Sequence, residues 1–330
     1  MLSKLEKNTT GFFQERSKGF VIIFTIFSTP LNPESGTSSN LQLVEELKDN
    51  MELDVATLRS EYDKPHHLIQ ASDGKVLFLR KWAPSVPSKT AIIIFHGITA
   101  YSGPYDSLGR PIAEAGYSVF GLDLRGHGLS DGARGDCPSK TRLVNDLCET
   151  IAFVLKQGFE GIILIGSSLG NLVAFEVLDN CSEQVAGLIL LSLGRTAKPD
   201  AYPKMSTGEK LKTVGKILFA NSRPVIEYKR EGMIRPDDPL FNFKYTPRFL
   251  RILNAQRFMN KYQFPEQFDF PVLVGIGDDD EIFSVETARA FFDEVPSENK
   301  EFQIIPKAKH AETHDLCSPQ VIDWLKKNFD

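Results

Sequence analysis

Gly166, Ser168 and Gly170 form the pattern G-x-S-x-G near the middle of this 330-residue sequence. An apolar run at 161–165 precedes the pattern and a helical stretch at 171–177 follows it, so we expect a tight turn from a strand into a helix. Such a turn holds a serine hydroxyl clear of the sheet, where the N-terminal amides of the helix face developing negative charge. Ser168 is therefore the predicted nucleophile. Chance produces the bare string in about one chain in ten of this length, so an ordinary turn with an incidental serine is the alternative.

A serine hydroxyl attacks a carbonyl carbon only when a base removes its proton, and that base is itself oriented by a carboxylate. His310 follows an apolar run at 302–306 near the end of the sequence, and it is the predicted base. His314 is the alternative, but its position four residues further on assigns it to the approach to the last helix.

The carboxylate partner is expected in the acidic run at 278–281, which follows an apolar strand at 272–277. Catalytic groups gather at the carboxyl ends of such strands. Asp280 is preferred because it lies three residues beyond Gly277, on the loop after the strand, and Asp279 is the alternative. The order serine, acid, histidine along the chain is the order expected for a nucleophile carried on a strand-to-helix turn.

Two backbone amides are predicted to bind the oxygen of the attacked carbonyl. One is the amide of Ile98, just after the strand that ends at His96, and the other is the amide of Leu169, which follows the nucleophile. Donors of this kind stabilise the tetrahedral oxyanion, and the loss of one lowers the rate by about 10²–10³-fold. We expect His96 to orient the loop that carries the first amide, and His127 to hold the loop after the next strand.

Short apolar runs alternate with longer amphipathic stretches from about residue 66 onward. This alternation is typical of an α/β fold in which helices flank a mostly parallel sheet, here with eight strands. The predicted strands are 67–71, 76–81, 91–96, 118–123, 162–166, 185–191, 272–277 and 302–306. The predicted helices of this part are 105–115, 139–157, 169–179, 284–294 and 318–329.

The predicted segments are an N-terminal extension at 1–60, a first part of the α/β core at 61–194, a cap at 195–265 and a second part of the core at 266–330. The extension carries an apolar strip from Phe20 to Phe27, a linker at 29–40 and a helical stripe from Leu41 to Leu58. The strip is too short to span a bilayer, and no A-x-A cleavage site follows it. We interpret it as a buried strip, with contact to a lipid surface or a secretory role as alternatives.

The cap interrupts the alternation of strands and helices with Pro-punctuated, basic sequence. An insertion of this length between two strands forms a lid more readily than an independent domain, and we expect helices at 209–219 and 247–261. The cap has a basic face made of Lys204, Lys210, Lys212, Lys216, Arg223, Lys229 and Arg230. Contact with a lipid surface through the cap is therefore an open alternative as well.

The composition is that of an ordinary globular protein, with 42% apolar and 25% charged residues. A net charge of −5 gives no general attraction to nucleic acid, so a nucleic-acid partner is not expected. Cys137, Cys148, Cys181 and Cys317 form neither a CxxC pair nor a zinc pattern. We expect Cys148 and Cys181 to be free, buried thiols, and we interpret the scattered cysteines as those of a cytoplasmic protein.

Several longer strings resemble the α/β hydrolases of the monoacylglycerol lipase, lysophospholipase and serine aminopeptidase S33-like group. The matching strings are HGI at 96–98, DLRGHGLS at 123–130, GARG at 132–135, GSSLG at 166–170, GDDDEI at 277–282 and AKH at 308–310. Together they cover about residues 66–330, and the cap string RPDDPL at 235–240 looks like the Asp-Pro-Leu segment of monoacylglycerol lipases. The basic cap face and residues 1–60 depart from the group.

The resemblance implies an α/β-hydrolase fold with a catalytic triad of Ser168, Asp280 and His310, an oxyanion hole at Ile98 and Leu169, and acyl-ester substrates that enter beneath the cap. The expected function is hydrolysis of carboxylic esters through an acyl-enzyme, with acylglycerol or lysophospholipid-like esters as substrates and without a metal or an organic cofactor. Acyl transfer from the same acyl-enzyme and a non-catalytic binding role are the alternatives.

Overall fold

The computed structural model describes residues 53–329 apart from residues 87, 203, 205, 229–236, 254–261, 263 and 265–266. The chain divides into two units, residues 1–53 and 54–330, and nearly all described residues belong to the second. The predicted strip from Phe20 to Phe27, the linker and most of the predicted helix after it lie outside the described residues. The described part begins with α3 (Val55–Ser60), whose first turn is capped by the Asp54 side chain at 3.0 Å from the Thr57 amide nitrogen.

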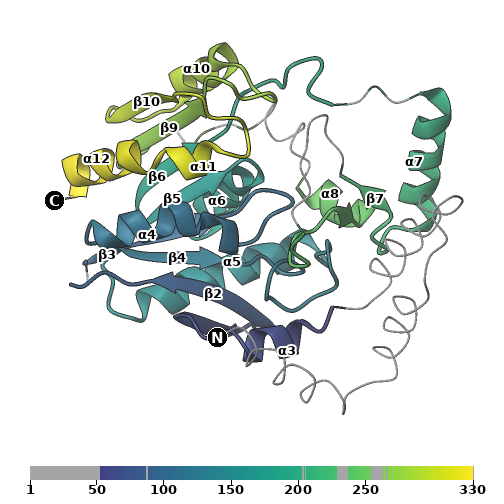
Figure 1. Ribbon diagram of the computed structural model, residues 1–330, viewed down its shortest axis with the longest axis horizontal. Helices are drawn as coiled ribbons and strands as arrows, with labels where there is room; N and C mark the ends of the chain where they lie inside the picture. Colours follow the sequence, from purple (N-terminus) through teal and green to yellow (C-terminus); the bar gives the residue numbers. More distant parts are fainter. Residues whose placement is uncertain are drawn as a thin grey trace, which may run out of the picture. The chain divides into compact units, whose positions relative to one another are not determined.

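An eight-stranded sheet forms the centre of the second unit (Figure 1). In spatial order its strands are β1 (His66–Gln70), β2 (Val76–Trp82), β4 (Ser118–Leu122), β3 (Thr90–Phe95), β5 (Gly161–Ser167), β6 (Val185–Leu191), β9 (Val272–Gly277) and β10 (Lys300–Ile305). Strand β2 runs antiparallel to both of its neighbours, and the other neighbouring pairs are parallel. The predicted fold class, a mostly parallel α/β sheet flanked by helices, is confirmed.

Helices cover both faces of the sheet. They are α4 (Asp106–Glu114), α5 (Lys140–Leu155), α6 (Leu169–Asn180), α10 (Val285–Glu294) and α12 (Ser318–Phe329), with a short η1 (Gly103–Tyr105) and α11 (Thr313–Leu316). Ile93 packs into one core with α5, α6 and α10, whereas Ile92 and Ile94 pack into a second core with α4 and α12. This alternation follows from the two-residue period of side chains along a strand. For the sheet strands and the five main helices, no predicted end differs from the observed end by more than two residues.

The chain between β6 and β9 leaves the sheet and forms a separate set of small elements (Figure 1). These are α7 (Thr207–Phe219), β7 (Ile226–Glu227), β8 (Lys244–Tyr245) and α8 (Pro247–Ile252). Helix α7 starts two residues before the predicted start at 209 because Ser206 and Glu209 form a capping box. The predicted helix at 247–261 ends at Ile252, and residues 254–261 lie outside the described part. The division into core and cap domains stays a prediction.

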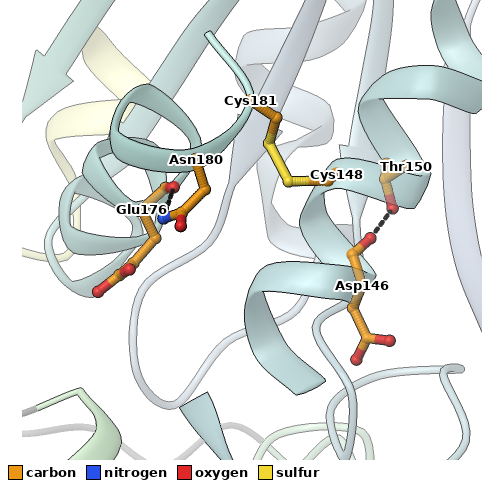
Figure 2. The surroundings of a disulfide bond; sticks show 6 residues. All are labelled: Asp146, Cys148, Thr150, Glu176, Asn180 and Cys181. Atoms are coloured by element: carbon orange, nitrogen blue, oxygen red, sulfur yellow. Dashed lines mark hydrogen bonds between the residues drawn. A yellow bond between two sulfur atoms is a disulfide. The ribbon is translucent and has the colours of Figure 1, made fainter. Parts of the chain in front are cut away.

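Cys148 and Cys181 are joined by a disulfide, so the prediction that both are free thiols was wrong. Figure 2 shows the bond between α5 and the residue that follows α6. The two Cα atoms are 5.7 Å apart although 33 positions separate them in sequence, because α5 and α6 pack on the same face of the sheet. Cys137 and Cys317 are free and buried. Disulfides persist in oxidising compartments, so the cysteines no longer support the cytoplasmic interpretation.

Among the helices of the described residues, none combines the length and the apolar character that crossing a bilayer requires.

Candidate active site

The predicted nucleophile lies on the turn from β5 into α6. Strand β5 ends at Ser167 and helix α6 begins at Leu169, so Ser168 alone forms the connection, with φ of 53°. This left-handed value is strained for a residue that carries a Cβ, and it persists only where the surroundings enforce it. The Ser168 amide donates to the Leu191 carbonyl at 3.0 Å, and the Asn171 side chain donates to the Ser168 carbonyl at 2.9 Å.

Both glycines of the pattern are required by close backbone contacts. A Cβ on Gly170 would lie 2.0 Å from the carbonyl oxygen of Phe95, at the end of β3. A Cβ on Gly166 would lie 2.6 Å from the Cα of Asn171. The turn is thus so tight that the helix start touches the neighbouring strand, and only glycine fits at these two positions. These two close contacts explain why the pattern has glycine at positions 166 and 170.

Ser168, His310 and Asp280 are brought together in one hydrogen-bonded line. His310 Nε2 lies 2.8 Å from Ser168 Oγ, and His310 Nδ1 lies 2.9 Å from Asp280 Oδ2. Because a carboxylate only accepts hydrogen bonds, we assign the ring proton to Nδ1, which leaves Nε2 to accept the serine proton. The loops after the parallel neighbours β9 and β10 supply the acid and the histidine, so both reach the same edge of the sheet.

Asp280 is fully buried and fixed by its own loop. Its Oδ1 accepts hydrogen bonds from the amides of Ile282 at 2.8 Å and Phe283 at 2.9 Å, so that Oδ2 is directed at the histidine. The alternative acid, Asp279, is exposed to solvent. The structure therefore brings Asp280, and not its neighbour, to the histidine.

The backbone of His310 is held by Glu281, from the acidic run at 278–281, and by Ser192, which the sequence did not single out. The His310 amide donates to Glu281 Oε2 at 2.8 Å, and Ser192 Oγ donates to the His310 carbonyl at 3.1 Å. Ser192 follows β6 directly and has a φ of 54°. Its place at the carboxyl end of a central strand was a usable signal, since polar groups at that edge border the site.

His314, the alternative base, lies in a different environment. Its ring stacks on Tyr105 with 4.2 Å between the ring centroids, and its Nε2 is 3.5 Å from Asp315 Oδ1. Burial lowers the pKa of the His314 imidazole below its ordinary value. Within the described part of the chain, Ser168 bonds to the ring of His310 and not to that of His314.

The loop after β3 carries the first predicted oxyanion donor. His96 is fully buried, and its Nε2 accepts from the Leu124 amide at 3.2 Å while its Nδ1 donates to the Gly97 carbonyl at 2.8 Å. Burial lowers the pKa of His96, which keeps the ring neutral and able to accept. The Gly97 amide donates to the Tyr105 hydroxyl at 2.9 Å. His96 thus joins the loops after β3 and β4.

The two predicted oxyanion donors flank the nucleophile. Gly97 borders the turn, since a Cβ built on it would lie 3.7 Å from the Ser168 Cβ. Within the described ranges, neither the Ile98 amide nor the Leu169 amide donates to another protein group. The Leu169 amide has no intrahelical acceptor because it belongs to the first residue of α6.

The loop after β4 is held by its own polar residues. Asp123 accepts hydrogen bonds from the amides of Ser102 at 2.6 Å and Leu129 at 2.8 Å. His127 is fully buried with its Nδ1 3.1 Å from the Arg125 carbonyl, and burial lowers the pKa of its ring well below the ordinary value. His127 therefore has the loop-holding position that the sequence predicted.

Comparisons with known proteins identify a family and several relatives of this chain. The protein family described as "Serine aminopeptidase, S33" matches residues 86–316. The chain is 32% identical to monoglyceride lipase of Rattus norvegicus over 42% of this chain and 46% of that protein. It is 23% identical to monoacylglycerol lipase of Mycolicibacterium smegmatis over 82% of this chain and 98% of that protein. The chain spans less than half of the length of several curated relatives that it matches.

A solved structure shows the same fold. A soluble variant of monoglyceride lipase from Saccharomyces cerevisiae, in complex with a substrate analog, superimposes with a TM-score of 0.64 at 17% identity. The alignment covers 82% of this chain and 99% of that one. At 17% identity, this comparison shows a shared fold and nothing about activity.

Proposed function

This chain belongs to the serine aminopeptidase S33 family of α/β hydrolases, and we propose that it cleaves carboxylic esters through an acyl-enzyme on Ser168. The expected resemblance to this group is thereby confirmed. The observation that carries the proposal is the continuous line of hydrogen bonds from the Ser168 hydroxyl through His310 to Asp280. A nucleophile, a base and an orienting carboxylate in this arrangement are suited to acyl transfer.

The proposed cycle begins when Ser168 Oγ attacks the ester carbonyl carbon and its proton passes to His310 Nε2. Asp280 stabilises the imidazolium that forms, and the amides of Ile98 and Leu169 bind the tetrahedral oxyanion. The intermediate collapses to an acyl-enzyme as His310 returns the proton to the leaving alcohol. A water molecule then attacks the acyl carbon with His310 as the base, and the second collapse releases the acid and restores the serine hydroxyl.

We further propose long-chain acyl esters of glycerol or glycerophospholipids as the substrate class. The relatives named monoglyceride lipase and monoacylglycerol lipase support this choice. A panel of p-nitrophenyl esters from acetate to palmitate, together with a monoacylglycerol and a lysophospholipid, tests it. We expect kcat/KM to rise with acyl length and at least one of the two lipids to be hydrolysed. Preference for acetate, with neither lipid hydrolysed, would contradict the substrate class while leaving the esterase mechanism intact.

Helix α7 supports a lipid-facing role for the cap. Leu211, Val214 and Phe219 are 74%, 49% and 89% exposed, an unusual share of apolar surface for a single helix. Lys212 and Lys216 are exposed one turn apart on the adjoining face. An apolar face bordered by lysines fits the headgroup region of an anionic lipid surface, which we propose as its partner. Of the predicted basic face, the side chain of Lys210 and residues 229 and 230 lie outside the described part.

Replacing Phe219 with aspartate is expected to weaken binding to anionic vesicles by about tenfold or more, since a buried phenylalanine contributes about 1.5–3 kcal/mol. Cosedimentation with phosphatidylcholine vesicles, with and without phosphatidylglycerol, measures the effect. Val86→Asp is the matched control, because Val86 is 73% exposed but lies outside the cap. Equal binding by Phe219→Asp, Val86→Asp and the unaltered protein, or equal binding to neutral vesicles, would exclude the proposed surface.

A further inference from the structure

A segment of the insertion is bonded directly to the loop that carries the Ile98 amide. The Tyr245 hydroxyl, at the end of β8, donates to the Ile98 carbonyl. The Asn242 amide donates to the Thr99 carbonyl at 2.9 Å, and the Asn242 side chain donates to the Gly126 carbonyl at 2.7 Å. The insertion thus ties together the loops after β3 and β4.

We propose that Tyr245 is a positioning residue for the oxyanion hole, through which the cap segment fixes the orientation of the Ile98 amide. This inference rests on the proposed esterase function, because it concerns the amide that would bind the oxyanion. Tyr245 does not touch the reacting atoms in this scheme. It acts on the rate through the backbone of the loop.

The geometry of the loop explains how a carbonyl contact aims an amide. The Ile98 amide shares its peptide plane with the Gly97 carbonyl, which accepts from His96 Nδ1 at 2.8 Å and from the Ala100 amide at 3.2 Å. The Ile98 carbonyl belongs to the next plane and is held by Tyr245. Because each peptide is planar, the contacts of the Gly97 carbonyl orient the Ile98 amide in the same plane, and the contact of the Ile98 carbonyl restricts rotation about the Ile98 backbone that joins the two planes.

Tyr245 is itself rigidly placed and remains a donor. The side chain is fully buried, and its ring stacks on Phe249 with 5.3 Å between centroids and lies 5.9 Å from the ring of His127. Burial raises the pKa of the phenol well above its ordinary value, so the hydroxyl keeps its proton. Its acceptors are two carbonyl oxygens, those of Ile98 and of Asn242 at 3.0 Å.

The strand that carries Tyr245 is anchored to the core. A Cβ on Gly135 would lie 2.0 Å from the Lys244 carbonyl oxygen, so β8 rests directly on the loop after β4. The Thr246 amide donates to the Gly135 carbonyl at 3.0 Å, and the Thr246 hydroxyl donates to Asp136 Oδ1 at 2.6 Å. The backbone that carries Tyr245 is therefore fixed to the core, so its hydroxyl can hold the Ile98 carbonyl in place.

The test is Tyr245→Phe in the full chain, which keeps the ring and removes the hydroxyl. We expect kcat for an acyl ester to fall about 10- to 100-fold with KM changed less than about twofold, because only the transition-state contact is loosened. The affinity for a trifluoromethyl ketone, which adds to Ser168 as a tetrahedral anion, should fall by the same factor as kcat/KM. Tyr62→Phe is the matched control: it removes a half-buried hydroxyl that bonds to Arg80, outside the loops of the site.

A second measurement separates this inference from the esterase proposal. Hydrogen exchange of the Ala100 amide, which donates to Gly97, reports on the loop without any turnover. We expect exchange to be faster in Tyr245→Phe than in Tyr62→Phe or the unaltered protein. If the unaltered protein hydrolyses no ester, the proposed function fails and the exchange alone decides the positioning role. Unchanged exchange, or unchanged kcat and ketone affinity in an active enzyme, would overturn that role.

Discussion

Replacing Ser168 with alanine is expected to lower kcat for an activated acyl ester by about 10⁶-fold, the scale seen when a triad serine is removed from a serine protease. In the proposed mechanism Ser168 Oγ forms the acyl bond, and alanine offers no substitute. The remaining rate would come from the oxyanion amides and from substrate binding. The rate of p-nitrophenyl ester hydrolysis measures the loss of kcat. Thermal unfolding shows whether the variant is folded.

A fluorophosphonate probe gives an independent measure of the same prediction. The unaltered protein should be labelled at Ser168 and the Ser168→Ala variant should not. The neighbouring Ser167 is buried in β5, so Ser167→Ala should retain labelling and serves as the matched control. Full hydrolysis by Ser168→Ala would refute the mechanism. Absence of labelling in the unaltered protein would instead favour a non-catalytic role for the fold.

Replacing Asp280 with asparagine is expected to lower kcat by about 10⁴-fold, as in the corresponding substitution of a serine protease triad. The asparagine Oδ1 can still accept from the amides of Ile282 and Phe283, so the loop keeps its shape. Its NH₂ group then faces His310 Nδ1 and forces that nitrogen to accept. The ring proton moves to Nε2, where it blocks removal of the proton from Ser168.

The measurement for Asp280→Asn is kcat at fixed pH against that of Asp279→Asn. Asp279 is adjacent and exposed, so its amide variant changes the local charge equally and should retain activity within about threefold, as for most surface substitutions. A reversed result, with Asp279→Asn inactive and Asp280→Asn active, would show that Asp279 and not Asp280 is the acid. If both variants retained full activity, the mechanism would not depend on either carboxylate.

The juxtaposition of Ser168, Asp280 and His310 could be predicted because each residue follows a strand with a recognisable pattern. The apolar runs before Ser168, Asp280 and His310 identify β5, β9 and β10, and parallel strands bring their carboxyl ends to one edge. The choice of Asp280 over Asp279 also depended on position within the loop. The structure adds the reason, since one carboxyl group is buried against two amides and the other is exposed.

Contacts between elements distant in sequence could not be predicted in this way. The bond between Cys148 and Cys181 depends on how two helices pack on the sheet, and no local spacing encodes that packing. Ser192 and Tyr245 reach His310 and the Ile98 loop across 118 and 147 positions, respectively. The place of Ser192 after a central strand indicates that it borders the site, but neither segment by itself shows which group its side chain contacts.

The sequence by itself determined the class of fold, the bounds of the strands and main helices, and the strand-to-helix turn at Ser168. These follow from the two-residue and 3.6-residue periods of apolar side chains and from glycines at tight turns, which are properties of short segments. The tertiary structure alone decided the disulfide, the bond from Ser192 to the His310 carbonyl, and the bond from Tyr245 to the Ile98 carbonyl. Those contacts depend on the relative placement of whole elements, which long-range packing sets and local pattern does not.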